Sequence, residues 1–268
     1  MTPPIAPPTA PSPTIYEPAP GPVDPLGGDL VTLLRALKLS GMKDTLPQRL
    51  SLAKTRQLSH HQFLEQILAD EVARREERSA ASRAIRSGLI PRMRIETWTE
   101  PDDLHYDRQA LSDLTTLRFT DAGHNLLILG PVGIGKTHLA TALGHIAVRR
   151  RHTVWMTRAE KLFTRLRAAR LDHTLDQEVR RITRLDLLII DDFALKTLDA
   201  LTTNDFYELV VERHARAAAT IITSNRDPAE WLTMTSDQLL AQAGVDRLTG
   251  RAHTLILNGP SYRQRQPA

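Results

Sequence analysis

The sequence predicts an α/β fold, in which a parallel sheet is flanked by helices and preceded by a small all-helical domain. Two observations predict it. From Asp29 to about Gly88 apolar residues repeat at helical spacing, whereas after about Thr120 short β-type runs alternate with helical segments. Such alternation is typical of a parallel sheet covered by helices on both faces. The change of pattern places a boundary near residue 115 and predicts domains at residues 29–115 and 116–268, after a leader at 1–28.

The composition excludes several classes of protein. The chain has 268 residues, of which 41% are hydrophobic and 25% charged, and it has no cysteine. The hydrophobic share allows a buried core, and the lack of cysteine excludes disulfide scaffolds, thiolate metal sites and cysteine nucleophiles. No run of about 18 apolar residues exists, so no membrane span is expected. His60, His61, His138 and His145 lack partners at zinc-ligand spacing, so we expect no transition metal.

The leader is rich in proline. Its 28 residues hold ten of the seventeen prolines and no lysine or arginine. Secretory signals need a basic start and transit peptides need arginines, so neither fits and the cytoplasm is the expected location. Repeated proline removes backbone donors and fixes φ, which predicts an extended, unstructured segment. Binding to a proline-reading module is the alternative.

The helical region has two recognisable helix starts. Asp29 is an N-cap candidate before a leucine-rich face, and Ser59 with Gln62 forms a capping box. The second helix then carries an apolar stripe consisting of Phe63, Leu64, Ile67, Leu68 and Val72. Beyond this stripe the sequence turns basic, with seven arginines against three glutamates between Glu71 and Arg94.

Four strands are expected in the second domain. They are Asn125–Leu129, Thr153–Met156, Leu187–Ile190 and Thr220–Thr223. Amphipathic or charged segments between them are long enough for crossover helices.

One glycine-rich run carries the strongest chemical signal. Residues Gly130 to Thr137 match G-x-x-x-x-G-K-[ST] between an apolar strand and a helix-like run, which is the context that the motif requires. In such a loop the backbone N–H groups point toward the phosphate oxygens. Lys136 is then expected to reach the β- and γ-phosphates, and the Thr137 hydroxyl is expected to bind Mg²⁺. A chance glycine turn is the alternative, and a dinucleotide fingerprint fails because its third glycine is absent after Gly135. The predicted nucleotide contacts are Gly130, Pro131, Gly133, Ile134, Gly135, Lys136, Thr137 and His138.

Two acids follow the third expected strand. The strand delivers Asp191 to the metal, and Asp192 is placed to act as general base on the attacking water. An apolar strand that simply ends in a polar loop is the alternative. At the end of the fourth strand, Asn225 could orient the water or the γ-phosphate, or simply form a turn.

Basic residues gather in two stretches. Residues 149–184 hold eleven Lys/Arg against four Asp/Glu, and the second stretch runs from Arg74 to Arg94. Few aromatics interleave with these charges, which favours contact with duplex phosphates over base stacking. Solvated helix faces are the alternative. The predicted DNA contacts are Arg74, Arg75, Arg78, Arg83, Arg86, Lys161, Arg165, Arg167 and Arg170.

Taken together, these motifs resemble AAA+ ATPases, and most closely the IstB-like transposition helper ATPases, which are near the DnaC-type helicase loaders. The resemblance covers about residues 30–265 and rests on five ordered runs: 130–140, 187–192, 221–226, 246–248 and 261–263. It implies that Asn225 is a sensor residue, that Arg247 is an arginine finger for a neighbouring subunit, and that Arg263 is a second sensor. An ordinary surface position is the alternative for either arginine.

The chain departs from the pattern of these relatives at three places. Val132 and Ile134 replace the more usual proline and threonine, and Phe193-Ala194 stands where Leu-Gly is expected. Asp192 is one methylene shorter than the glutamate of most AAA+ proteins, although the loader-like clade also uses aspartate, and slow hydrolysis would be consistent with this shorter base.

The resemblance implies an ATPase that uses ATP and Mg²⁺, assembles as a homo-oligomer on double-stranded DNA and recruits or activates a transposase. A loader for a replicative helicase is the main alternative. A small-molecule phosphotransferase and a binding module with a structural nucleotide are further ones.

Overall fold

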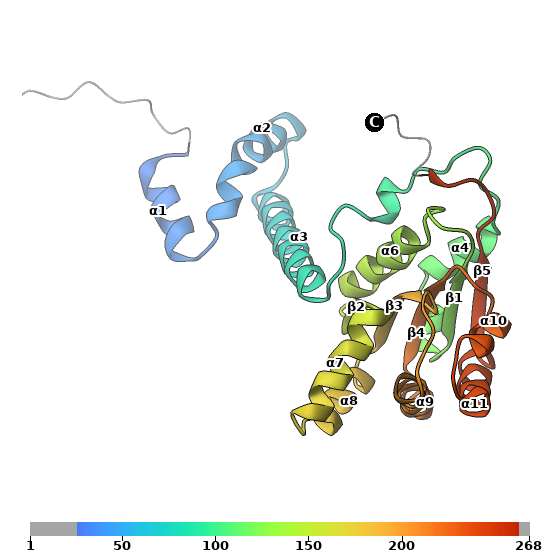
Figure 1. Cartoon of the computed structure of the whole chain (residues 1–268). Helices are drawn as coiled ribbons and strands as arrows, with labels where there is room; N and C mark the ends of the chain where they lie inside the picture. Colours follow the sequence, from blue (N-terminus) through green and yellow to red (C-terminus); the bar gives the residue numbers. More distant parts are fainter. Residues whose placement is uncertain (1–25, 263–268) are drawn as a thin grey trace, which may run out of the picture. The chain divides into compact units, whose positions relative to one another are not determined.

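The computed structural model describes residues 26–262. Within them, five strands form one sheet in the order β2-β3-β4-β1-β5 (Figure 1), and every neighbouring pair is parallel. The strands are β1 Asn125–Leu129, β2 Val154–Arg158, β3 Leu187–Phe193, β4 Ala219–Ser224 and β5 Ala252–Ile256. The order places β4 between β1, which leads into the glycine-rich loop, and β3, which carries the two acids.

Alternation along each strand builds two cores, one on each face of the sheet. Leu126 and Ile128 of β1 join one cluster of buried side chains, while Leu127 and Leu129 join the other. Successive side chains of a strand point to opposite faces, so an unbroken apolar run such as β1 needs cover on both.

Helices provide this cover (Figure 1). Buried side chains of four helices belong to the first cluster: the end of α3 His60–Arg86, through Ala84, and α4 Arg108–Thr115, α5 Arg118–Asp121 and α6 Lys136–Arg149. The second cluster takes its side chains from α7 Ala159–Leu171, α8 Leu175–Thr183, α9 Ala200–Ala215, α10 Pro228–Thr233 and α11 Gln238–Thr249. The predicted α/β fold is therefore confirmed, with all four expected strands present. The fifth strand, β5, was not expected, because its residues are mostly polar or half exposed.

The N-terminal helices enclose a small core of their own. They are α1 Gly28–Ala36, the 3-10 turn η1 Ser40–Asp44, α2 Leu46–Arg56 and α3 His60–Arg86. The capping box at the start of α3 is confirmed, since the Ser59 N–H donates to the Gln62 side chain and the Gln62 N–H to the Ser59 hydroxyl. Asp29 is not the N-cap of α1. Gly27 takes that position, and Asp29 lies in the first turn.

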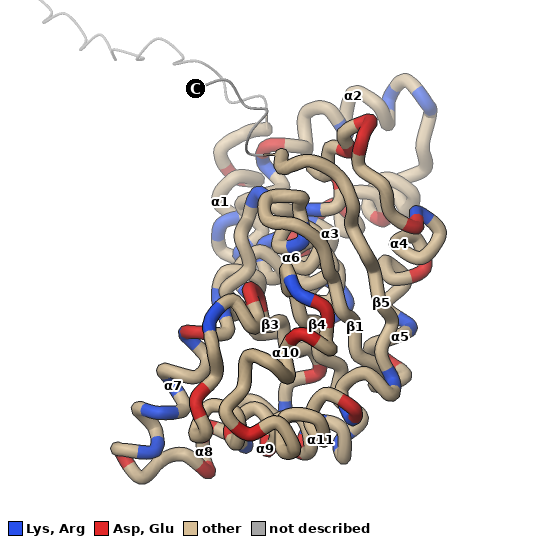
Figure 2. The backbone as a smooth tube through the Cα atoms, turned by 45° about the vertical axis from the view of Figure 1, so that its right-hand side comes forward, with Lys and Arg blue, Asp and Glu red and all other residues tan. Residues whose placement is uncertain are grey.

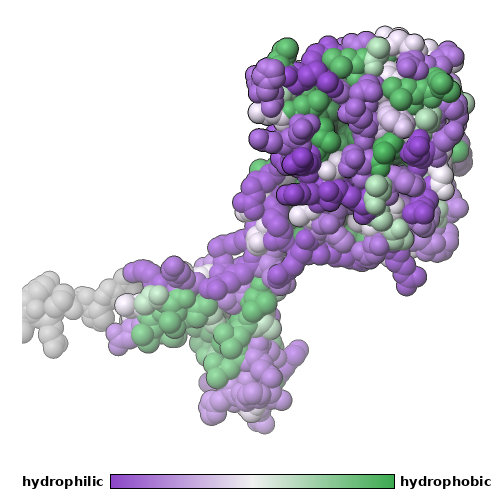
Figure 3. All heavy atoms as spheres, turned by 90° about the horizontal axis from the view of Figure 1, so that it is seen from below, coloured by the Kyte–Doolittle hydropathy of each residue, from purple (hydrophilic) through white to green (hydrophobic). Residues whose placement is uncertain are grey.

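Part of the expected apolar stripe on α3 faces solvent. Ile67 is buried, whereas Leu64 and Val72 are each 56% exposed. Exposed leucines of α1 add to this surface, and green atoms gather on these N-terminal helices in Figure 3.

The chain divides into two compact units between Arg74 and Arg75, within α3. The sequence suggested a boundary near residue 115, about forty positions later. The intervening stretch belongs to the core of the second unit, since Leu89, Leu104 and Leu111 are buried in its first cluster. Leu89 and Leu104 lie outside any helix or strand, so no periodic pattern marks them as core residues. The proline-rich residues 1–25 of the expected leader lie outside the described part of the chain.

No helix within residues 26–262 is long and apolar enough to cross a bilayer.

Candidate functional site

The glycine-rich loop joins β1 to α6. Gly130, Gly133 and Gly135 have φ values of 145°, 80° and 108°, which only glycine adopts readily. A Cβ on Gly130 would lie 2.2 Å from the carbonyl oxygen of Leu257. The loop therefore needs its glycines for conformation and for space, and α6 begins directly after it at Lys136.

Lys136 folds back over the loop. Its Nζ donates hydrogen bonds of 2.7 Å to the carbonyl oxygens of Gly130 and Pro131. The residue is only 6% exposed. A buried ammonium with carbonyl partners, at the N-terminus of a helix, forms a positive site for a phosphate group.

The loop and the third strand meet through Thr137 and Asp191. The Thr137 hydroxyl donates a hydrogen bond of 2.9 Å to Oδ1 of Asp191, and the Thr223 hydroxyl donates one of 2.6 Å to the same oxygen. Burial raises the pKa of Asp191, while the two hydroxyl donors act in the opposite direction. The predicted convergence of the loop with this acid is thus present in the fold.

This pair of oxygen ligands fits Mg²⁺. Magnesium is usually held by one or two protein oxygens, with phosphate and water oxygens completing the shell. Among the described residues no group of three or more His, Cys, Asp or Glu could hold a metal ion by itself. Thr137 and Asp191 therefore suit an ion that arrives with a nucleotide.

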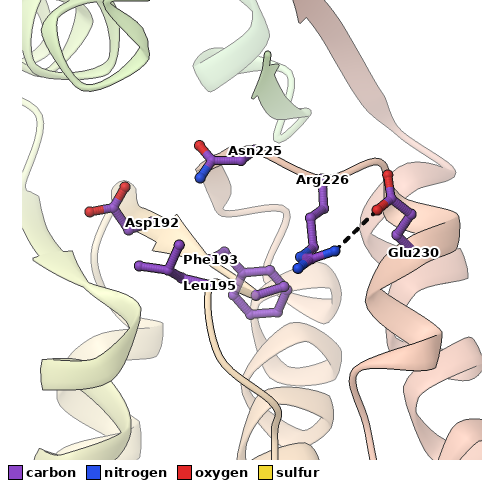
Figure 4. Close-up of a pocket in the computed structure, with 7 residues that line it drawn as sticks. Asp192, Phe193, Leu195, Asn225, Arg226 and Glu230 are labelled. Atoms are coloured by element: carbon purple, nitrogen blue, oxygen red, sulfur yellow. Dashed lines mark hydrogen bonds and ion pairs between the residues drawn. The ribbon is translucent and has the colours of Figure 1, made fainter. Parts of the chain in front are cut away.

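Asp192 lies beside the same loop with a partly exposed carboxylate. Its backbone has a φ of 56°, in the left-handed region. Arg158, at the end of β2, approaches the carboxylate to 3.9 Å. Figure 4 shows the amide of Asn225 directed toward the side of Asp192 across the open space between them. Both residues line two neighbouring cavities.

The larger cavity has a volume of about 690 Å³, within the usual range for small-molecule sites. The loop from Val132 to His138 forms its floor, and Asp192 and Asn225 contribute to its wall. Further lining comes from a segment that precedes the sheet and from the last described residue: Arg92, Met93, Thr97, Trp98, Thr99, Pro101 and Tyr262. The glycine-rich loop, Asp192 and Asn225 therefore line one cavity.

Trp98 packs directly on the glycine-rich loop. A Cβ on Gly135 would lie 2.4 Å from its Cη2, and the His138 ring lies edge-on at 5.1 Å between centroids. His138 is anchored by a 2.9 Å contact between Nε2 and the carbonyl oxygen of Arg94. Trp98 is not among the contacts that the sequence predicts, because residues 92–101 contain no motif that points to the site.

The smaller cavity, of about 230 Å³, lies next to the acids. The Arg226 guanidinium reaches Glu230 at 3.3 Å along its edge, as the dashed line in Figure 4 shows.

The predicted arginine finger and second sensor differ in what the structure describes of them. Arg247 does not line the cavity of its own chain; it donates to the carbonyl oxygen of Ala243 and lies 5.4 Å from the Tyr207 ring centroid. Arg263 lies outside the described residues. Its neighbour Tyr262 donates its N–H to the carbonyl oxygen of Gly133 at 2.9 Å, which brings the chain to the loop.

Three arginines predicted to contact DNA bind carboxylates of the same chain. Arg165 pairs with Glu178, Arg167 with Asp199 and Arg170 with Asp205, at 2.5, 3.0 and 2.6 Å. Figure 2 shows acidic segments among the basic ones on α7 and α8.

Of the other predicted DNA contacts, Arg74 and Arg83 make contacts within the protein. Arg74 pairs with Glu71 at 2.6 Å, and Arg83 donates to the carbonyl oxygen of Val148 at 3.1 Å. Arg75, Arg78, Arg86 and Lys161 are exposed. Arg180 and Arg184, which are not among these predicted contacts, are also exposed, and they line a hollow of about 480 Å³ on α8.

Comparison with known proteins places this site in a family. The family described as IstB-like ATP binding protein matches residues 32–268. An ATP-binding protein in an insertion sequence of Mycobacterium tuberculosis is 36% identical over 233 residues, which cover 87% of this chain and 93% of that protein.

Solved structures share the fold at lower identity. AMPPCP-bound DnaA from Aquifex aeolicus has a TM-score of 0.52 at 22% identity, covering 62% of this chain and 50% of that chain. The DnaC helicase loader has a TM-score of 0.50 at 18% identity, covering 56% of this chain and 87% of that chain. The parallel sheet with helices on both faces is therefore the AAA+ fold, and the chain belongs to the IstB-like family of ATP-binding proteins.

Proposed function

We propose that this protein is an ATP-hydrolysing helper of transposition, which assembles on double-stranded DNA and recruits or activates a separate transposase. The bond between Thr137 and Asp191 carries the proposal, because it joins the phosphate loop to the acid strand. The chain belongs to a family of ATP-binding proteins, and relatives in this family are named for insertion sequences. This membership supports a role in the transposition of such an element.

The residues divide the chemistry among them. The loop N–H groups and Lys136 bind the phosphates, and Thr137 with Asp191 holds Mg²⁺. When bound, Mg²⁺ neutralises charge on the phosphate oxygens. Asp192 accepts the proton of the attacking water, and Asn225 orients that water or the γ-phosphate.

We propose that Arg247 acts on the nucleotide of a neighbouring subunit. Its absence from the cavity of its own chain supports this role. An arginine supplied by a neighbour couples hydrolysis to assembly, because the complete site exists only in the oligomer. Arg263 is proposed as the second sensor on the strength of the family resemblance alone.

For DNA contact, exposed cations that make no ion pair among the described residues are better candidates than exposed cations that do. A guanidinium that already binds a carboxylate must give up that bond before it binds a phosphate. We therefore favour Arg78, Arg86 and Lys161 of the predicted contacts, and we add the exposed cations Arg180 and Arg184 to the proposed surface.

ATPase rate and sedimentation with and without duplex DNA test the proposal, for wild type, Lys136→Ala and Arg247→Ala. We expect DNA to stimulate wild-type hydrolysis, Lys136→Ala to lose nucleotide binding, and Arg247→Ala to bind nucleotide but hydrolyse slowly. Hydrolysis by a monomer with no response to DNA would favour a small-molecule phosphotransferase instead.

The fold shared with the DnaC helicase loader favours one second candidate, a loader for a replicative helicase. Pull-down with the transposase of the same insertion sequence and with the host replicative helicase separates the two. Retention of the transposase in an ATP-dependent manner is the expected result.

A further inference from the structure

A β-bulge places the two acids of β3 side by side. Ile190 pairs with Ile222 of β4, and Phe193 pairs with Ser224, so Asp191 and Asp192 together stand opposite Thr223. In a regular strand, consecutive side chains point to opposite faces. The extra residue and the left-handed backbone of Asp192 therefore re-aim the second carboxylate.

At a bulge one backbone N–H lacks its carbonyl partner on the neighbouring strand, and here a side-chain hydroxyl takes the place of that carbonyl. The N–H of Asp192 donates to the Thr223 hydroxyl at 3.0 Å. That hydroxyl donates its own proton to Oδ1 of Asp191 at 2.6 Å. One hydroxyl thus fixes the carboxylate of the first acid and the backbone of the second.

We infer that Thr223 is a positioning residue for the nucleotide site. It holds Asp191 toward the metal and keeps Asp192 in the bulged conformation that aims its carboxylate at the cavity. Thr223 is 0% exposed, so water cannot take over its two hydrogen bonds. This inference rests on the proposed function, in that it assigns Asp191 to Mg²⁺ and Asp192 to the attacking water.

The hydroxyl and the packing of Thr223 can be separated by substitution. Thr223→Val keeps the volume and β-branch but removes the hydroxyl, whereas Thr223→Ser keeps the hydroxyl and removes a methyl group. Thr220→Val is the matched control. It lies on the same strand and is also buried, but its hydroxyl accepts from Arg213 on the side away from the acids.

The direct readout is binding of a fluorescent, non-hydrolysable ATP analogue at increasing Mg²⁺ concentration. Loss of an outer-shell partner typically costs about 10–100-fold in metal affinity. We expect Thr223→Val to need about 10-fold or more Mg²⁺ for half-maximal binding, with affinity in EDTA within about 3-fold of wild type. Thr223→Ser and Thr220→Val should both keep the wild-type Mg²⁺ requirement.

Hydrolysis gives the second readout. For Thr223→Val, kcat should fall by about 10-fold or more while KM for ATP at saturating Mg²⁺ changes little, because the P-loop contacts are intact. A wild-type Mg²⁺ requirement and kcat in Thr223→Val would overturn the inference. So would a raised Mg²⁺ requirement in Thr223→Ser, which would assign the effect to packing. That result overturns the inference even if Thr223→Val does not fold.

Failure of the proposed function would give a different result from failure of the inference on Thr223. In that case the folded wild type itself shows no Mg²⁺-dependent nucleotide binding or no hydrolysis.

Discussion

The hydroxyl of Thr137 and Oδ1 of Asp191 lie 2.9 Å apart, although the residues are 54 positions apart in the chain. A magnesium ion bound between them would replace a contact that already exists. The two ligands are therefore arranged before the ion arrives, which lowers the cost of ordering them on binding.

Asp191→Asn should separate metal binding from nucleotide binding. The amide keeps the shape but removes the charge that holds Mg²⁺, so hydrolysis should fall on the order of 100-fold. Nucleotide affinity in EDTA should stay within about 3-fold, because the loop and Lys136 are unchanged. Fluorescent-nucleotide titration with and without Mg²⁺ measures both effects, and full activity of the variant would remove Asp191 from the metal site.

Gly135→Ala should damage the loop for two separable reasons. Its φ of 108° is strained for alanine, and the new Cβ would lie 2.4 Å from Trp98. We expect a loss of about 1–3 kcal/mol in stability from the strained backbone alone, with weaker nucleotide binding. Adding Trp98→Ala removes the clash but not the strain, so the double variant should recover part of the nucleotide affinity lost in Gly135→Ala.

The control is Gly244→Ala in α11, where the nearest atoms lie at 3.4 Å or beyond. Thermal and chemical unfolding should find this variant as stable as wild type. Equal nucleotide binding by Gly135→Ala and wild type would show that the loop tolerates a side chain there.

Arginines on α7 and α8 should differ in their roles. Arg180→Ala with Arg184→Ala should lower duplex affinity, with a loss of about 0.9 in the log–log salt slope for each phosphate contact removed. Arg170→Ala should chiefly lower the free energy of unfolding, because its partner Asp205 is buried and would lose its counter-charge. Fluorescence anisotropy at several salt concentrations, beside urea unfolding, distinguishes them. If Arg170→Ala instead lowered DNA affinity while Arg180→Ala with Arg184→Ala did not, the DNA surface would lie on α7.

His145 should make stability depend on pH. Burial lowers its pKa, with Arg94 and Arg149 contributing further, while its contact with the Ile90 carbonyl opposes the shift. The unfolded chain therefore binds more protons between the folded pKa and about 6.5, so the free energy of unfolding rises with pH through that window and is flat above it.

Urea unfolding between pH 5 and pH 8 measures this slope for wild type and His145→Gln. The slope should be reduced in the variant and kept in His173→Asn, which changes an exposed histidine. An unchanged slope in His145→Gln would assign the pH dependence to other groups.

Arg213→Lys should be strongly destabilising despite its conserved charge. The Arg213 guanidinium is 2% exposed and donates to the Thr220 hydroxyl and to three carbonyl oxygens, of Ile182, Leu185 and Ala219. Burial lowers its pKa to about 9, so the desolvation cost is already large. An ammonium cannot reach four acceptors in this geometry, and we expect a loss of about 2–4 kcal/mol by urea unfolding. A variant as stable as wild type would show that a point charge suffices.

The sequence predicts the site better where a motif encodes local geometry than where distant segments meet. The loop from Gly130 to Thr137 and the acids after β3 were found because spacing and strand pattern are local signals. Trp98 and Thr223 were missed, since a tryptophan in a connecting stretch and a threonine in a strand carry no sign of their partners. Those partners, Gly135 and the two acids, are set by tertiary packing.

The same distinction explains the arginines of α7. Their density along the chain is visible in the sequence, but the carboxylates that bind Arg167 and Arg170 come from α9 and its N-cap, more than thirty positions away. The net charge of the α7 sequence alone therefore overstates the positive charge of this surface, because carboxylates from α9 and its N-cap pair with two of its arginines.

The strand order has a consequence for biosynthesis. β4 is inserted between β1 and β3, yet the ribosome produces it after both of them. Until residues 219–224 have emerged, the central strand of the sheet is missing, and so is the Thr223 hydroxyl that bonds both Asp191 and the N–H of Asp192. Nucleotide can therefore stabilise the nascent chain only late in translation, and an earlier pause leaves two exposed edges for chaperones to shield.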